Sequence, residues 1–195
     1  MSRHRYEARP GGLTHAIRDE YMRTMTIDPS DEGALSLVAS SSPDDPVYFW
    51  QLYSLLGQRR LRDLIQTFYE LVMADDTYFG KHFAELGPLH HHVERQLLFW
   101  LDATGGGVTY RGGMFKLEAK HRLSQEIMHV KASRRWMYHF VRALRRCDLG
   151  EEPVRALACI VDFLCYFMHR YAVEFDFNFA DSMVFRSFGN YSCKL

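Results

Sequence analysis

A single histidine, His121, lies in the stretch 117-LEAKHRLSQEI-127 among apolar residues at helical spacing. If the segment is helical, Leu117 lies one turn before His121 and Met114 lies two turns before it, so the three side chains share one face. An imidazole on an apolar face needs a polar partner. That partner is usually a neighbouring carbonyl or carboxylate, and the chemically interesting alternative is a bound metal or cofactor.

Two other patterns could carry chemistry, and neither favours a known type of site. His90, His91 and His92 are consecutive, and neighbouring helical residues point about 100° apart, so they cannot all bind one zinc ion. The chain has no glycine-flanked nucleophile elbow, and its cysteines lack an electropositive setting. We therefore expect neither a zinc site at these histidines nor hydrolase chemistry.

A third arrangement is a flat cofactor held between helices in an aromatic interior. One histidine from a short helix and polar groups from two long helices would converge on it. Haem iron is held in this manner by a proximal histidine, and the polarity of the opposite pocket decides what a bound gas does.

The composition is that of one folded domain. The chain has 195 residues, of which 47% are hydrophobic and 14% aromatic, enough for a packed core. Lys and Arg balance Asp and Glu at 24 each, so no overall charge recruits nucleic acid or an anionic membrane. No apolar run approaches the roughly 18 residues of a membrane span, and the amino end lacks a signal core. We therefore expect a cytoplasmic protein.

The cysteines agree with that location. Cys147, Cys159, Cys165 and Cys193 form no CxxC pair, and Cys159 and Cys165 point to different sides of the helix expected there. We interpret all of them as reduced thiols.

Hydrophobic periodicity predicts an all-α fold with no strands. Residues 1–46 are polar and include the linker-like 39-ASSSPDDP-46, so we expect a disordered tail there, although 12–25 could form a short helix. The folded domain is expected over 47–173, and 174–195 form a C-terminal extension.

Helical spacing recurs in five segments of that domain. Gly57 divides the first segment, 48–76, and the segment 75–88 is expected to be a loop. A helix over 89–105 ends at three glycines, a short helix holds His121, and further helices cover 132–147 and 151–172. Tyr69 lies at the edge of a buried face, where its hydroxyl needs a partner.

The order and spacing of these pieces resemble the truncated haemoglobins, also called 2/2 globins, over about residues 53–168. The resemblance is carried by the Tyr, Gly and Phe-Tyr of 53-YSLLGQRRLRDLIQTFYELVMADD-76 and by the long helix and glycine turn of 91-HHVERQLLFWLDATGGGVTY-110. The segments 117-LEAKHRL-123 and 134-RRWMYHFVRAL-144 look like the proximal helix and the helix with the pocket tryptophan. The resemblance implies a globin-like, two-on-two helical sandwich around haem b.

The same resemblance assigns roles to particular residues. His121 would be the proximal iron ligand, Tyr69 the distal hydroxyl and His92 the distal gate, with His92 also a possible second ligand to the iron. The remaining residues assigned to the cofactor site are Gln96, Phe99, Leu117, Trp136 and, at the corner before the distal helix, either His82 or Phe83.

The function implied is reversible binding of O₂, NO or CO at haem iron. A polar distal pocket slows release of the ligand, which suits sensing, scavenging or redox chemistry better than bulk transport. NO dioxygenase or peroxidase-like turnover would need an electron-donating reductase, so whether the protein is an enzyme stays open, as does its oligomeric state. The alternative is a cofactor-free helical interaction module on the same fold, which the aromatic C-terminus would serve.

Overall fold

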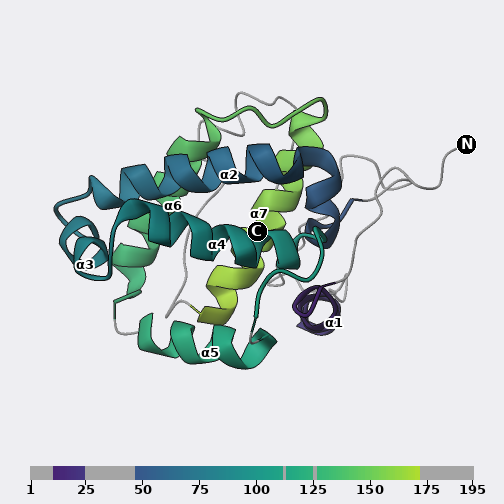
Figure 1. Cartoon of the computed structure of the whole chain (residues 1–195), viewed down its shortest axis with the longest axis horizontal. Coiled ribbons are helices and arrows are strands. Elements are labelled where there is room, and N and C mark those ends of the chain that lie inside the picture. Colours follow the sequence, from purple (N-terminus) through teal and green to yellow (C-terminus); the bar gives the residue numbers. More distant parts are fainter. Residues whose placement is uncertain (1–10, 25–46, 112, 125–126, 172–195) are drawn as a thin grey trace, which may run out of the picture.

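The computed structural model describes residues 11–24, 47–111, 113–124 and 127–171, and the regular elements within these ranges are helical (Figure 1). In chain order they are α1 (Thr14–Thr24), the 3-10 turn η1 (Phe49–Gln51), α2 (Leu52–Met73), α3 (Gly80–Glu85), α4 (Leu89–Ala103), α5 (Gly113–Ser124), α6 (Val130–Leu144) and α7 (Pro153–Tyr171). The predicted all-α class is confirmed. None of the described helices combines the length and apolar composition needed to cross a membrane.

Helix α2 is the centre of the fold, and it packs against α4, α6, α3 and α7. In Figure 1 it runs along α4 with α6 behind it. Its buried residues Leu61, Leu64, Ile65, Phe68 and Val72 follow helical spacing, and each is at most 2% exposed. Gly57 has a φ of 66°, which breaks the regular backbone at the position expected from the sequence.

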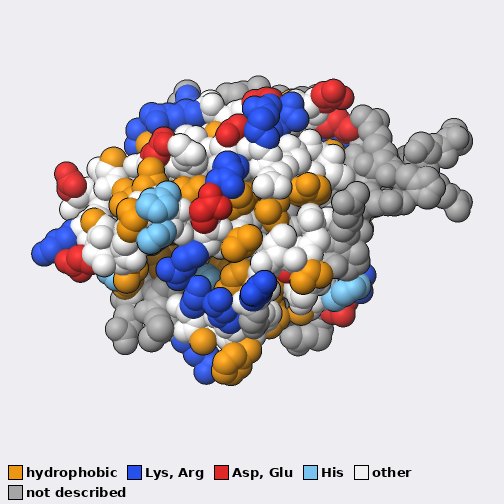
Figure 2. Space-filling model, viewed as in Figure 1, with side chains coloured by type: hydrophobic (Ala, Val, Ile, Leu, Met, Phe, Trp, Pro, Cys, Tyr) orange, Lys and Arg blue, Asp and Glu red, His pale blue; other side chains and the backbone are white. Residues whose placement is uncertain are grey.

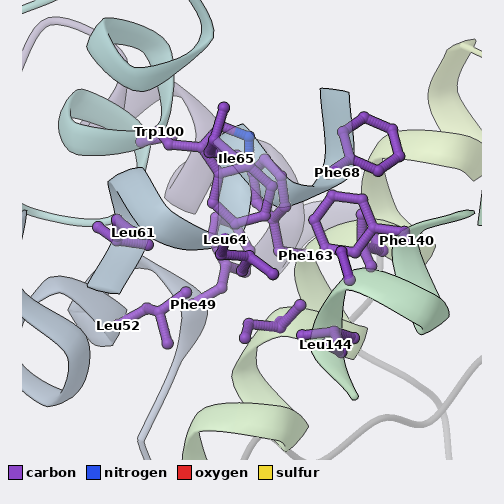
Figure 3. Close-up of a cluster of buried hydrophobic side chains, with 14 of the residues drawn as sticks. Phe49, Leu52, Leu61, Leu64, Ile65, Phe68, Trp100, Phe140, Leu144 and Phe163 are labelled. Atoms are coloured by element: carbon purple, nitrogen blue, oxygen red, sulfur yellow. The ribbon is translucent and has the colours of Figure 1, made fainter. Parts of the chain in front are cut away.

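The core is formed by apolar side chains that converge from η1, α2, α4, α6 and α7 (Figure 3). Trp100 of α4 and Phe163 of α7 lie with ring centroids 4.5 Å apart, and Phe68 of α2 lies 4.7 Å from Phe140 of α6. These four aromatic residues also line a cavity. The core therefore fixes one wall of the candidate site.

The amino-terminal region differs from the unpacked tail expected over 1–46. Leu13 and Ile17, one turn apart, are fully buried, and the backbone N–H of Leu13 donates to Asp102 Oδ1 at 2.7 Å. Helix α1 packs against α4. The structure therefore differs from an unpacked tail over residues 11–24 and agrees with the alternative of a short helix over 12–25, because an apolar pair and a buried acceptor outweigh the polar composition. Residues 1–10, 25–46 and the C-terminal extension from 172 lie outside the described residues.

The segment 75–88 also differs from the expected loop, because it contains the short helix α3. The carbonyl oxygen of Asp75 accepts from the backbone N–H groups of Phe79 and Gly80, at 3.1 and 2.7 Å. Phe79 is 1% exposed and anchors the turn. Cys147 and Cys159 are free thiols, and the expectations for Cys165 and Cys193 fall outside the described side chains.

Candidate functional site

A cavity of about 300 Å³ lies among α2, α4, α5, α6 and α7, and its wall is mostly aromatic and aliphatic. Its volume is at the lower end of the range for small-molecule sites, roughly 300 to 1,000 Å³. Of the residues assigned to the site from the sequence, the following line it: Tyr69, His82, Phe83, His92, Gln96, Phe99, His121 and Trp136. The sequence therefore identified 8 of the 22 described residues that line the cavity.

His121 projects from α5, and its Nδ1 lies 2.7 Å from the carbonyl oxygen of Leu117. A carbonyl oxygen only accepts, so Nδ1 carries the hydrogen and the ring lone pair is on Nε2. Burial lowers the pKa of His121, which keeps the imidazole neutral at neutral pH. A neutral ring held by one nitrogen on a backbone carbonyl is the form in which histidines bind metals. The carbonyl partner expected for a buried histidine is thus present, but it binds Nδ1. A metal would bind the other nitrogen, Nε2.

Leu117 supplies a backbone acceptor to the site. Its side chain is buried in the core at 2% exposure and does not line the cavity. The assignment of Leu117 to the cofactor site stays a prediction. Its backbone oxygen orients the His121 ring.

Tyr69 of α2 presents an unused donor to the cavity. It is 3% exposed, and in the described part of the chain its hydroxyl makes no hydrogen bond. Burial raises the pKa of Tyr69 far above its usual value, so the hydroxyl stays protonated. Because Tyr69 lines the cavity, a ligand with an acceptor atom there could take this hydrogen bond.

His92 of α4 stacks against Tyr69, with ring centroids 5.7 Å apart and 15° between the planes. It is 7% exposed, so it is buried beside the cavity. Its Nε2 hydrogen is shared by the carbonyl oxygens of Phe83, at 2.9 Å, and Gly87, at 3.1 Å. To act as a second metal ligand, His92 would have to give up both contacts.

Gln96 and Phe99 follow His92 on the same face of α4. Gln96 is half-buried, and its amide forms no hydrogen bond with another described residue. The ring of Phe99 lies 5.8 Å from that of Tyr110 and 5.4 Å from that of Phe167. This face therefore presents one polar group followed by an aromatic wall.

Trp136 of α6 completes the opposite wall, with ring contacts to Phe68 at 4.7 Å, Phe79 at 5.4 Å and Phe83 at 5.7 Å. Both candidates for the corner residue line the cavity. Phe83 also contacts Tyr69, at 5.8 Å, so it is the one that joins the aromatic cluster.

A hydrogen-bonded network around the buried Asp75 carboxylate connects α6 to the corner between α2 and α3. Asp75 Oδ2 accepts from Arg135 Nε at 2.7 Å and from His139 Nε2 at 2.6 Å. Burial alone would raise the pKa of Asp75, but the hydrogen bonds from Arg135 and His139 outweigh it and lower that pKa to about 2. Trp136, which lines the cavity, lies between these two residues in the chain, so the network holds the part of α6 that carries it.

Several lining residues were not anticipated, notably Arg95, Tyr110, Lys120 and Phe167. Burial lowers the pKa of Lys120, and Arg95 nearby lowers it further. Figure 2 shows Lys and Arg side chains gathered over the region between α4 and α5, beside apolar surface. The adjacency of Lys120 to His121 was the one sequence signal that could have identified a cation here.

These features fit the haem that the resemblance implies. A neutral imidazole lies on one helix, aromatic rings supply flat apolar walls, and Arg95 and Lys120 are suited to carboxylate groups. The model of the bacterial-like globin family matches residues 51–169, which run from the last residue of η1 to the last turn of α7. No curated protein sequence matches the chain. The chain belongs to the bacterial-like globin family.

Proposed function

We propose that this globin is of the truncated, 2/2 type and binds haem b through Nε2 of His121. The globin family itself implies haem binding. The observation that carries the choice of ligand is the hydrogen bond from His121 Nδ1 to Leu117, because it fixes a neutral ring with its lone pair on Nε2. His92, by comparison, has its Nε2 hydrogen on two carbonyl oxygens.

Other residues would hold the cofactor by shape and charge. Phe99 and Phe167 supply apolar surface on the side of α4 and α7, and Trp136 supplies it on the side of α6. Arg95 and Lys120 would pair with the two propionate groups, which removes the cost of placing carboxylates beside an apolar cavity.

When bound, haem iron supplies a coordination position for O₂, NO or CO. Tyr69 and Gln96 are the donors that would stabilise partial negative charge on such a ligand. Because the Tyr69 hydroxyl has no acceptor in the described part of the chain, the whole of its hydrogen-bonding capacity is available to the ligand. The result is slow release, which favours sensing, scavenging or redox chemistry. A redox role would take its electrons from a reductase.

Haem titration of the purified apoprotein tests this function. We expect a sharp Soret band that saturates at one haem per chain, with the bound haem retained through gel filtration. His91→Ala, an exposed substitution on α4, is the control for loss of a histidine and should saturate at the same ratio. A well-folded wild-type protein that takes up no haem would contradict the proposal and favour the cofactor-free interaction module.

A further inference from the structure

Asp102, near the end of α4, is fully buried, and its carboxylate is shared by two segments that are far apart in the chain. Oδ1 accepts from the backbone N–H of Leu13 at 2.7 Å. Oδ2 accepts from the backbone N–H groups of Tyr110, at 3.1 Å, and Thr109, at 3.3 Å. A buried carboxylate is costly without donors, so both segments are needed to satisfy this one.

The amino-terminal segment fits closely onto Asp102. Thr14 Oγ1 donates to the backbone oxygen of Asp102 at 2.5 Å and accepts from the N–H of Gly11 at 2.9 Å. A methyl group on Gly11 would overlap the Asp102 carboxylate and would lie 2.7 Å from the carbonyl oxygen of Gly107. Ile17, fully buried, adds apolar contact. Hydrogen bonds to Asp102, close packing of Gly11 and burial of Ile17 therefore hold this segment against α4.

The contact of Asp102 Oδ2 with Tyr110 connects the carboxylate to the cavity. Tyr110 lines it, with its ring 5.8 Å from that of Phe99 and with Lys116 Nζ 5.5 Å from its centroid. Helix α5, which carries His121, begins three residues later at Gly113. In Figure 1 α5 lies at the lower edge of the molecule, and it packs sparsely against the other described helices. Within the described residues, α5 is held by buried Leu117, by the contact of the His121 and Phe167 rings at 4.8 Å, and by the connection that Asp102 binds.

We propose that residues 11–24 form a strap and that Asp102 is the positioning residue through which the strap fixes the connection from α4 to α5. Loss of the strap frees Oδ1, lets water reach the carboxylate and loosens Thr109 and Tyr110. The cavity wall and the proximal helix then become mobile. The strap lies outside the residues 51–169 that match the family. Its consequence for haem retention rests on the proposed function.

Hydrogen exchange on the full chain tests the strap with two adjacent glycines. Gly11→Ala introduces the overlap with Asp102, whereas an added methyl on the exposed Gly12 meets nothing within 4 Å. We expect Gly11→Ala to accelerate exchange at residues 105–111 and in α5 about tenfold, the size expected for loss of a hydrogen bond to a charged group. Gly12→Ala should match the wild type. Thr14→Val, which removes only the hydroxyl contacts, should act in the same direction as Gly11→Ala.

Equal exchange in Gly11→Ala and Gly12→Ala would overturn the proposal, and so would equal acceleration in α2, α4 and α6. Measured on the apoprotein, this experiment is independent of haem. With haem bound, Gly11→Ala should also release haem to apomyoglobin several-fold faster than Gly12→Ala. Faster exchange in α5 in a protein that binds no haem would leave the strap standing and remove the proposed function instead.

Discussion

The rings of Tyr69 and His92 stack 5.7 Å apart, yet their polar groups serve different parts of the molecule. The Nε2 hydrogen of His92 is held by the carbonyl oxygens of Phe83 and Gly87, whereas the hydroxyl of Tyr69 has no acceptor in the described part of the chain. His92 thus connects α4 to the end of α3 through these hydrogen bonds, and its ring packs against the ring of Tyr69. Tyr69 is the donor that remains for a ligand.

Tyr69→Phe should accelerate O₂ dissociation by about tenfold or more, because a hydrogen bond in a dry pocket is worth roughly 1.5 to 3 kcal/mol when charge develops on the acceptor. Stopped-flow release from the ferrous protein measures this rate. Tyr138→Phe, at an exposed tyrosine on α6, is the matched control. Unchanged release in both Tyr69→Phe and Gln96→Leu would place the distal donors elsewhere.

The ferrous protein without an external ligand should be five-coordinate. Binding of iron by His92 would break two hydrogen bonds and move the hydrogen from Nε2 to the other nitrogen, at a cost of roughly 1 kcal/mol for each bond. Absorption spectra of the deoxygenated protein report the coordination. A six-coordinate low-spin spectrum that becomes five-coordinate in His92→Leu would show that His92 binds iron after all.

Acid should destabilise the fold through Asp75. Its pKa falls from 3.8 to about 2 on folding, so its stabilising effect is complete above about pH 4 and is lost as the pH falls toward 2. The effect is on the order of 2 kcal/mol. Urea unfolding between pH 6 and 3 should show a smaller acid dependence in Asp75→Asn than in the wild type. The exposed Asp63→Asn serves as control, and an acid dependence equal in all three proteins would refute the role of Asp75.

Leu64→Ala should destabilise the protein by about 2 to 5 kcal/mol, because this fully buried residue of α2 would leave a hole in the core. It does not line the cavity, so haem stoichiometry should be kept. Leu98→Ala, at a residue 43% exposed, should change the unfolding free energy by less than about 1 kcal/mol. Equal losses in the two variants would mean that the core has been misassigned.

Helical spacing indicated which face of a helix a side chain occupies, and the resemblance to the truncated haemoglobins assigned Tyr69, Gln96 and Trp136 to the site. All three line the cavity. For Leu117, spacing could not reveal that its backbone carbonyl accepts a hydrogen bond from His121. A periodic pattern shows which face of a helix a side chain occupies, but it does not show which backbone groups form hydrogen bonds with side chains.

The features that were missed depend on contacts between distant segments. Helix α3 has only six residues and begins at a glycine, so it leaves almost no periodic signal. The strap was hidden because Leu13 and Ile17 are isolated in a polar region, and its acceptor, Asp102, is 89 residues away from Leu13. A lone Asp at a helix end reads as solvent-exposed until the chain that covers it is known.

The measurement that tests the central claim most directly is haem retention by His121→Gly with and without added imidazole. The account predicts that the variant loses haem on gel filtration and that free imidazole, which can enter the space left by the side chain, restores a Soret band at one haem per chain. His91→Gly should keep its haem without imidazole. A His121→Gly protein that retains haem with the wild-type spectrum, unaffected by imidazole, would show that His121 does not bind the iron.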